Sequence, residues 1–190
     1  MRVVLERFVI EAERSVLLII DIQERLVTAV GEADAVIANA LHLIELSRLD
    51  DIPVLITQQY PQGLGPTVQA LRDALPEVEY INKTSFNCCK RPEFLEALKT
   101  IDRKTVIICG IETHICVLQT CVELLALGYF VHVVRDCVAS RSKDNKETAI
   151  EYMRDAGAVI TTTETVLFQA LKRADTDNFK TIVKRIIKVT

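Results

Sequence analysis

Short apolar runs alternate with longer amphipathic segments along almost the whole chain. The runs are nearly continuous in apolar residues, as in strands buried on both faces of a parallel sheet, and the segments between them have helical spacing. We predict strands at Ser15–Ile20, Pro53–Thr57, Val78–Asn82, Thr105–Gly110, Phe130–Arg135 and Ala158–Thr161. We predict helices at Ala33–Leu49, Thr67–Leu75, Pro92–Lys99, Cys116–Leu127, Lys143–Ala156 and Glu164–Leu171. This alternation predicts a three-layer α/β/α fold, with helices on both faces of a parallel sheet.

Length and charge limit the classes of protein to which this chain can belong. Its 190 residues suffice for a sizeable core, and no repeat or shift in composition marks a second unit, so we predict one domain over residues 1–190. A basic, apolar segment at helical spacing predicts a C-terminal helix at about 176–188, packed on this domain or on a neighbouring subunit. The net charge of −3 and the scattered Lys and Arg residues argue against nucleic acid as a partner.

The same composition bears on the cellular location. Charged residues interrupt every apolar run near the N-terminus, so we expect no signal peptide. No uncharged run is long enough to span a bilayer, so we expect no membrane partner. The expected location is therefore cytoplasmic, where the six cysteines would be thiols rather than disulfides.

Three chemically useful side chains follow predicted strands. Asp21 comes after the first strand, Lys83 after the third, and Cys116 after the fourth, at the end of the turn Gly110–Cys116. In an open parallel sheet, ligands bind beyond the carboxyl ends of the strands, so these side chains are expected at one edge. The start of a helix favours a thiolate, a carboxylate can take and return its proton, and an ammonium stabilises both anions. Together they indicate nucleophilic catalysis by Cys116.

Each of these three residues also has a purely structural interpretation. An Asp after a strand is often a helix cap or a turn residue, and a single Lys is commonly a solvated surface residue. A Cys at the start of a helix can be a small buried apolar residue. The occurrence of all three at matching strand ends is the more specific signal, and it favours the catalytic interpretation.

Residues next to these three are candidates for contacts with a substrate. Phe86 and Ile115 are expected to form pocket walls. His114 is expected to line the pocket or act as a second base, or else to face solvent or another subunit. Weaker candidates near the strand ends are Gln23, Gln58, Tyr60 and Asn87. Thr113 and Thr120 are expected to satisfy backbone or helix groups rather than touch substrate.

The remaining cysteines have different expected roles. The adjacent Cys88 and Cys89 suggest a redox or metal role, but neighbouring cysteines form only a strained disulfide, and no Cys-x-x-Cys pair supports zinc. Cys109 lies within a predicted strand and Cys121 on the apolar stripe of a predicted helix, so both are expected to pack in the core. Cys137 follows the fifth strand, and its position leaves both kinds of role open.

Several segments carry a resemblance to a known superfamily. They are Leu17-Leu-Ile-Ile-Asp-Ile-Gln23, Lys83-Thr-Ser-Phe86, Gly110-Ile-Glu-Thr-His-Ile-Cys-Val-Leu-Gln-Thr120, Asp136-Cys-Val-Ala-Ser140 and Ala156-Gly-Ala-Val-Ile-Thr-Thr-Thr-Glu164. Through them the chain resembles the isochorismatase-like cysteine hydrolases, which include nicotinamidases and N-carbamoylsarcosine amidohydrolases. The third segment matches that family's G-[IV]-x-T-x-x-C-V pattern. The resemblance runs from about Val16 to about Phe168 and is nearest to the isochorismatase domain-containing proteins.

The resemblance implies a fold, a set of site residues and an assembly. The implied fold is a Rossmann-like six-stranded parallel sheet in the order 3-2-1-4-5-6. The implied site is a triad in which Asp21 is the general acid and base, Lys83 its charged partner and Cys116 the nucleophile. A cis peptide bond between Ile111 and Glu112 is implied to aim the backbone N–H groups of Glu112 and Cys116 into an oxyanion hole. The resemblance also implies a homo-oligomer, either a dimer or a larger assembly.

One departure from the superfamily bears on the chemistry. Nicotinamidases bind a metal through an Asp-x-His pair and a second His, whereas the matching stretch here, residues 57–62, has no histidine or carboxylate. We therefore expect no metal and no cofactor. The expected activity is hydrolysis of a small amide, carbamoyl or related acyl substrate through a thioester at Cys116. The alternatives are a non-catalytic protein-interaction or scaffold member of the same fold, and a thiol redox sensor that uses Cys88, Cys89 or Cys116.

Overall fold

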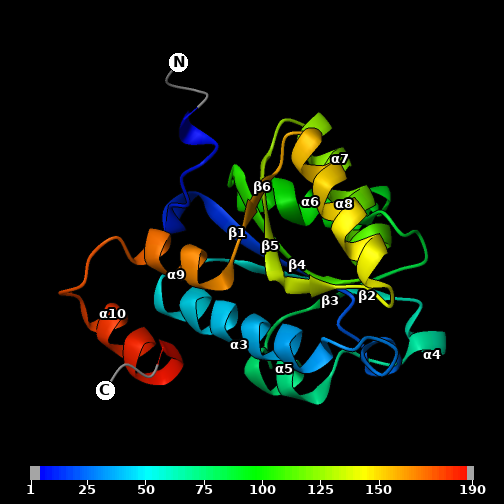
Figure 1. Cartoon of the computed structure of the whole chain (residues 1–190), viewed down its shortest axis with the longest axis horizontal. Coiled ribbons are helices and arrows are strands. Elements are labelled where there is room, and N and C mark those ends of the chain that lie inside the picture. Colours follow the sequence, from blue (N-terminus) through cyan, green and yellow to red (C-terminus); the bar gives the residue numbers. More distant parts are fainter. Residues whose placement is uncertain (1–4, 188–190) are drawn as a thin grey trace.

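The computed structural model describes residues 5–187 and contains a six-stranded sheet (Figure 1). The strands lie in the order β3-β2-β1-β4-β5-β6, and each neighbouring pair is parallel. Their bounds are β1 Ser15–Ile20, β2 Val54–Gln59, β3 Tyr80–Lys83, β4 Thr105–Ile111, β5 Phe130–Ala139 and β6 Val159–Thr161. The predicted α/β fold and the predicted strand order are both confirmed.

Helices connect the strands and cover both faces of the sheet (Figure 1). Their bounds are α2 Glu24–Val27, α3 Ala33–Leu49, α4 Pro61–Leu64, α5 Gln69–Ala74, α6 Pro92–Ile101, α7 Leu118–Ala126, α8 Lys143–Asp155, α9 Thr163–Leu171 and α10 Asp177–Ile182. Short 3-10 turns lie at Ala12–Arg14 and Cys88–Lys90, and π-helical turns at Thr113–Val117 and Val183–Ile187. The short helices α2 and α4 were not predicted, because a single helical turn carries too little periodicity to be recognised.

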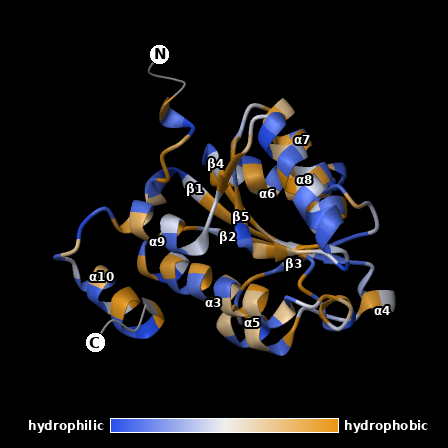
Figure 2. Ribbon diagram, in the orientation of Figure 1, coloured by the Kyte–Doolittle hydropathy of each residue, from blue (hydrophilic) through white to orange (hydrophobic). Residues whose placement is uncertain are grey.

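Alternate residues of the central strands feed two separate apolar layers. In β1, Leu17 and Ile19 pack with α3 and α9, whereas Val16, Leu18 and Ile20 pack on the other face with α6, α7 and α8. This division follows from the two-residue period of a strand. Figure 2 shows the strands largely in the colour of hydrophobic residues, while the surrounding helices mix hydrophobic and hydrophilic surfaces. Both faces of the sheet are therefore buried, as the continuous apolar runs predict.

β4 passes very close to β1 just before the chain reaches the cysteine turn. Gly110 is paired with Ile20 and has a φ of +139°, a conformation that side chains rarely adopt. A Cβ atom at this position would lie 2.1 Å from the backbone oxygen of Ile20. Glycine is therefore required here, and its presence lets the end of β4 lie directly beside the end of β1.

β5 continues past its predicted end at Arg135 because it contains an irregularity. Its register against β4 shifts between Ile108 and Gly110, and the strand then continues to Ala139. Arg135 and Asp136 are exposed at the irregularity, and the apolar pattern resumes after them. A bulge of this kind breaks the local pattern of the sequence without ending the strand.

The C-terminal segment packs beside α3 and α9 (Figure 1). The ring of Phe179 meets that of Phe168 edge to face, with centroids 5.9 Å apart, and Asn178 Nδ2 donates to the backbone oxygen of Leu49 at 2.8 Å. The helix expected at about 176–188 corresponds to α10 and the π-helical turn after it, and residue 188 lies outside the described residues.

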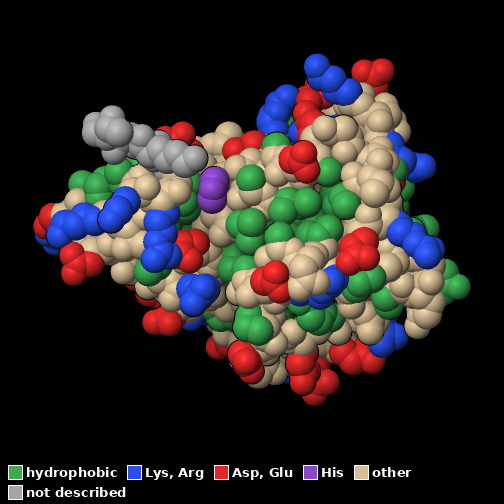
Figure 3. Space-filling model, turned by 90° about the horizontal axis from the view of Figure 1, so that it is seen from below, with side chains coloured by type: hydrophobic (Ala, Val, Ile, Leu, Met, Phe, Trp, Pro, Cys, Tyr) green, Lys and Arg blue, Asp and Glu red, His purple; other side chains and the backbone are tan. Residues whose placement is uncertain are grey.

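Figure 3 views the side of the molecule that carries α3, α5 and α10. Apolar side chains gather near the middle of this face, with charged side chains around them. Partly buried apolar residues of α2 and α3, namely Leu26, Val27, Ile37 and Leu41, pack against the apolar layer that contains Leu17 and Ile19. Within residues 5–187, no helix combines the length and the apolar character needed to cross a membrane.

Candidate functional site

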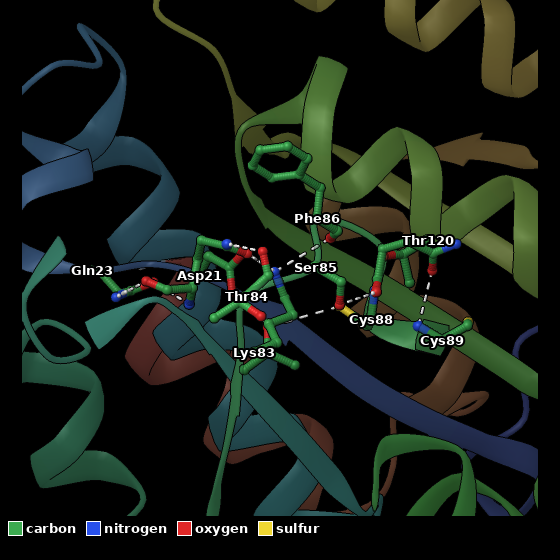
Figure 4. A network of polar contacts seen from close by, with 12 residues as sticks. Asp21, Gln23, Lys83, Thr84, Ser85, Phe86, Cys88, Cys89 and Thr120 are labelled. Carbon is green, nitrogen blue, oxygen red and sulfur yellow. Dashed lines mark hydrogen bonds and ion pairs between the residues drawn. The ribbon is translucent and has the colours of Figure 1, made fainter. Parts of the chain in front are cut away.

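The candidate site is built on a buried ion pair at the carboxyl edge of the sheet (Figure 4). Lys83, the last residue of β3, places its Nζ 2.6 Å from Oδ2 of Asp21, which directly follows β1. Both side chains are fully inaccessible to solvent. Asp21 has a φ of +53°, an uncommon conformation for a residue other than glycine, and Asp is among the residues that tolerate it best. The sequence thus brings an acid and an amine from two strand ends into direct contact.

Neighbouring polar groups complete the hydrogen bonds of this pair. The hydroxyl of Thr57 in β2 donates to Oδ1 of Asp21 at 2.7 Å. Nζ of Lys83 donates to Oε1 of Gln59 at 2.7 Å and to the backbone oxygen of Phe86 at 3.3 Å. The three protons of the ammonium therefore have three oxygen acceptors. Burial is the largest influence on the pKa of Lys83 and lowers it, but the charge of Asp21, the nearby thiols of Cys88 and Cys116 and the hydrogen bond to Asp21 together raise the pKa above its ordinary value.

Cys116 lies in the π-helical turn Thr113–Val117, between β4 and α7, and is 5% exposed. Burial, the negative charge of Asp21 and a hydrogen bond between the thiol and Asp21 raise the pKa of Cys116, and the charge of Lys83 opposes this only in part. The raised pKa runs against the expectation that the helix start favours a thiolate, and loss of contact with water is its main cause. It favours the protonated thiol, with the carboxylate of Asp21 beside it as a base.

The turn that carries Cys116 is anchored at its other end by Glu112. The peptide bond between Ile111 and Glu112 is cis. Glu112 is buried, and its carboxylate accepts hydrogen bonds from the backbone N–H of Arg141 at 2.9 Å and from its Nε at 3.0 Å. This contact ties the cysteine turn to the loop that follows β5. The backbone N–H groups of Glu112 and Cys116, predicted for the oxyanion hole, lie at the two ends of this turn.

Gln23, a predicted substrate contact, is fully buried and bonded within the protein. Its Nε2 donates to the backbone oxygens of Gln59 at 3.0 Å and Gly65 at 2.6 Å. Its Oε1 accepts from the backbone N–H of Gln59 at 2.7 Å. This amide has its hydrogen bonds filled by backbone groups, so it fixes the loop after β2 instead of facing a ligand.

The other predicted contacts lie around the cysteine turn in different environments. Nδ1 of His114 is 3.0 Å from Oγ of Ser140, and its Nε2 is 3.5 Å from Nδ2 of Asn145, so the ring faces the loop after β5 and the start of α8. Phe86 is 52% exposed and lies beside the ion pair (Figure 4). Ile115 is half-buried against the same apolar layer as Cys116. Phe86 and Ile115 therefore stay as the predicted pocket walls.

The weaker candidates differ in whether their side chains already bind other groups of the protein. Oε1 of Gln58 accepts from the backbone N–H of Thr67 at 2.7 Å. Oδ1 of Asn87 accepts from the backbone N–H of Cys89 at 2.9 Å. Tyr60 is exposed at the end of β2, where its φ is +38°. Gln58 and Asn87 are thus structural, whereas Tyr60 stays available at the surface.

The two threonines expected to have structural roles are both buried. The hydroxyl of Thr120 accepts from the backbone N–H of Cys88 at 3.0 Å, which confirms its predicted role. The hydroxyl of Thr113 has no hydrogen-bond partner among the described residues.

Cys88 is close to the site, and the sequence alone did not place it there. Its Sγ is 3.9 Å from the hydroxyl of Thr57, which itself binds Asp21. Burial raises the pKa of Cys88 to about 11, and Lys83 opposes this. The six cysteines are all buried and free of disulfides. Cys109 and Cys137 share one apolar layer, and Cys121 lies in the other, so the predicted packing of Cys109 and Cys121 is confirmed.

Thr57 and Gln59 are the functional neighbours that the sequence analysis missed. They are two residues apart on β2, so their side chains share one face of the strand and meet Asp21 and Lys83 together. Their signal in the sequence is a pair of polar residues at two-residue spacing, at the end of a buried apolar strand. Such a pattern indicates a polar network at the strand end.

The residues after β2 do not suit the metal site of nicotinamidases. Within the described part of the chain, no group of three or more His, Cys, Asp or Glu side chains is arranged to hold a metal ion. In the stretch where that metal site would lie, the amides of Gln58 and Gln59 are committed to protein partners.

Comparisons with known protein sequences agree with one another. The family model described as the isochorismatase domain matches residues 15–165. The secreted isochorismatase effector Isc1 of Phytophthora sojae is 40% identical over 177 residues, which cover 90% of this chain and 84% of that protein. Isochorismatase domain-containing protein 2 of Xenopus laevis is 38% identical over 175 residues, which cover 92% and 84%.

Solved structures share the fold over nearly the whole chain. The MAR1 ribonuclease from Caenorhabditis elegans has a TM-score of 0.88 and 38% identity, covering 94% of this chain and 92% of that one. YcaC from Pseudomonas aeruginosa, solved with hexane-2,5-diol and covalent acrylamide, has a TM-score of 0.87 and 25% identity, covering 92% and 90%. The YcaC gene product from Escherichia coli, described as an octameric hydrolase of unknown specificity, has a TM-score of 0.87 and 25% identity, covering 92% and 89%.

Proposed function

Because this chain belongs to the isochorismatase family, we propose that it is a metal-independent cysteine hydrolase. Its substrate is a small amide, carbamoyl or related acyl compound, and Cys116 is the nucleophile. The observation that carries this proposal is the fully buried Asp21–Lys83 ion pair in contact with the thiol of Cys116. Burial of a carboxylate, an ammonium and a thiol together is costly to stability, which favours a functional reason for the cluster.

The first half of the proposed reaction forms a thioester. The carboxylate of Asp21 takes the proton of the Cys116 thiol, and the thiolate attacks the carbonyl carbon of the substrate. The developing oxyanion accepts hydrogen bonds from the backbone N–H groups of Glu112 and Cys116. Asp21 then returns the proton to the leaving nitrogen, the C–N bond breaks, and an amine or ammonia departs.

The second half uses water and restores the thiol. Asp21 accepts a proton from a water molecule, which attacks the thioester carbonyl. The C–S bond breaks, the acid product leaves, and the proton held by Asp21 returns to Cys116. Lys83 keeps its charge throughout and holds the carboxylate in place, while Phe86 and Ile115 form apolar walls at the site.

A raised pKa at Cys116 is compatible with this route. The thiol reacts only after its proton has moved to Asp21, so the resting site carries a single buried ion pair. A related protein, YcaC from Pseudomonas aeruginosa, was solved with covalent acrylamide, so that protein contains a nucleophile that reacts with a small electrophile.

The test is turnover of a panel of small amides and carbamoyl compounds, measured as release of ammonia or amine. Cys116→Ala is expected to lose turnover by several orders of magnitude, because the nucleophile is absent. Cys121→Ala is the matched control, since this cysteine is also buried but lies on α7, in the apolar layer. Intact mass spectrometry should detect an acyl adduct in the wild type and none in Cys116→Ala.

Retention of turnover by Cys116→Ala would contradict the proposal. RNA is included in the panel because the related Caenorhabditis elegans protein is named a ribonuclease. The absence of any turnover, combined with partner binding that survives Cys116→Ala, would support the scaffold alternative. A reversible disulfide of Cys88 or Cys89 after mild peroxide treatment would support the redox sensor.

We also propose that residues 1–190 form a single catalytic domain in a cytoplasmic homo-oligomer. An octameric relative, YcaC from Escherichia coli, supports the assembly. The relative from Phytophthora sojae is a secreted effector, so location varies within the family. Sedimentation of the purified chain and fractionation of cells test the two statements separately.

A further inference from the structure

The ammonium of Lys83 donates hydrogen bonds to three oxygen acceptors, of which one is charged and two are neutral. One is the charged carboxylate of Asp21, at 2.6 Å from Nζ. The other two are neutral, namely Oε1 of Gln59 at 2.7 Å and the backbone oxygen of Phe86 at 3.3 Å. All three N–H groups are thereby directed at oxygen atoms, so Lys83 acts on the sulfur of Cys116 through its charge rather than through a hydrogen bond. The hydrogen-bond partners of Lys83 therefore influence the electrostatic potential at the sulfur of Cys116.

Gln59 is held rigidly in the orientation that presents its oxygen to Lys83. Its Nε2 donates to the backbone oxygen of Thr84 at 2.8 Å, so the amide cannot rotate without losing that bond. Its own backbone N–H and C=O are both bound by the side chain of Gln23, at 2.7 and 3.0 Å. Gln59 is 7% exposed, and Gln23 is completely buried. An amide fixed at both ends is a preorganised acceptor.

We propose that Gln59 is a positioning residue for the reaction, which holds the Lys83 ammonium as a neutral acceptor and so keeps its charge available to the Cys116 thiolate. This role rests on the proposed function, because it concerns the formation of the nucleophile. A second carboxylate at this position would place Lys83 between two negative charges and leave the cluster with a net negative charge. An anionic sulfur beside such a cluster is less stable.

The adjacent residue, Gln58, provides a matched control. It has the same side chain on the same strand and a similar exposure of 9%. Its amide contacts Asn82 and Thr67 rather than Lys83. A change of Gln58 to Glu therefore introduces the same charge into the same strand without placing it against the ammonium.

The readout is the pH dependence of alkylation at Cys116 by iodoacetamide, followed by peptide mass spectrometry. The titratable side chains around this thiol are Asp21 from β1, Lys83 from β3 and Cys88 from the turn after β3. Gln59→Glu is expected to slow alkylation about tenfold at every pH below the pKa of Cys116, as an upward shift of about one unit in that pKa would produce. Gln58→Glu is expected to change the rate by less than about threefold. Equal shifts in the two variants, or no shift in Gln59→Glu, would overturn the proposal.

A double-mutant cycle tests whether Gln59 acts through Lys83, and it covers the case in which Gln59→Glu does not fold. Gln59→Met removes the acceptor without adding charge, and it is expected to slow alkylation in the wild-type background. In a Lys83→Met background, the same change is expected to have no further effect. An equal slowing in both backgrounds would show that Gln59 does not act through the ammonium.

These measurements need no turnover. A chain that failed to hydrolyse any amide would still report whether Gln59 controls the thiol through Lys83. Failure of the proposed hydrolase activity and failure of the positioning role are therefore distinguishable.

Discussion

Lys83 and His132 are both buried, yet Lys83 is charged and His132 is neutral. Lys83 lies at the carboxyl edge of the sheet, with Asp21 and two neutral oxygens around its ammonium, and its pKa is raised. His132 is the third residue of β5, at the opposite end of its strand from the carboxyl edge, and it is fully inaccessible. Burial lowers the pKa of His132 to about 4, and the nearby backbone of Arg7 opposes this in part. Neither ring nitrogen makes a hydrogen bond of normal geometry within the described residues.

The difference shows what keeps a charge inside this fold. Both groups lose contact with water, which by itself favours the neutral form. At the strand ends, side chains from three parallel strands converge, and together they replace the lost water. Around His132, the layers that cover β5 are apolar and offer no such set of charged partners. The carboxyl edge of the sheet therefore holds an ion pair, whereas the body of β5 holds a neutral imidazole.

The largest effect is expected from removing the cation of the ion pair. Lys83→Met leaves the Asp21 carboxylate buried without its partner, so the free energy of unfolding at pH 7 should fall by about 3–5 kcal/mol. Urea denaturation measures this. Lys172→Met is the control, because Lys172 pairs with Glu13 on the surface, where both side chains are largely exposed. Its expected cost is less than about 1 kcal/mol. Similar losses in the two variants would mean that burial of the pair is energetically unimportant.

A somewhat smaller loss of stability is expected when the pH is lowered, because of His132. Its pKa in the folded protein is about 4, below the ordinary value of 6.5, so the unfolded chain takes up the proton first as the pH falls. Stability should be unaffected by this group above about pH 6.5 and should decline by about 3 kcal/mol between pH 6.5 and 4. The measurement is the difference in unfolding free energy between wild type and His132→Leu across this range. If this difference stayed constant with pH, the lowered pKa of His132 would be contradicted.

The hydrogen bond from Thr57 to Asp21 should have an intermediate effect. Thr57→Val keeps the shape of the side chain but removes the donor to Oδ1, so the free energy of unfolding should fall by about 2 kcal/mol. Thr100→Val is the control, since that hydroxyl binds only a backbone oxygen of its own helix at the surface. Thermal unfolding of the two variants should separate them clearly, and an equally small shift in both would mean that Asp21 finds another donor.

The smallest effect is expected at pH 7 from His132→Leu. The neutral ring has no hydrogen bond of normal geometry to lose among the described residues, and leucine suits the apolar surroundings, so stability should stay within about 1 kcal/mol or rise. Chemical denaturation checks this. A loss comparable to that of Lys83→Met would reveal a polar partner for the ring and would remove the contrast between the two regions.

Much of the fold could be predicted because its signals are local. The predicted helix Ala33–Leu49 has the observed bounds, and β1 was also predicted with its observed bounds. β3 was predicted at Val78–Asn82 but spans Tyr80–Lys83. An edge strand begins where its single neighbour pairs with it, and β2 pairs with it only over residues 80–83, so its bounds depend on a partner far away in the sequence.

The candidate site could be proposed from the sequence, but its electrostatics could not. Asp21, Lys83 and Cys116 stand out because they follow the first, third and fourth predicted strands. The raised pKa of Cys116 could not be predicted, because it depends on burial by the finished fold. The part played by Gln59 was also hidden, since its bond to Lys83 joins residues that are 24 positions apart.

The bonds of Gln23 also bear on how a substrate reaches the thiol. Its single amide joins the turn after β1 to Gln59 and to Gly65, so the segment after β2 is fastened at both of its ends. This segment cannot swing outward unless several buried hydrogen bonds break at once. We therefore expect small molecules to approach Cys116 past the exposed ring of Phe86. Bulk introduced at Phe86 should slow the arrival of a substrate more than bulk introduced at Gly65.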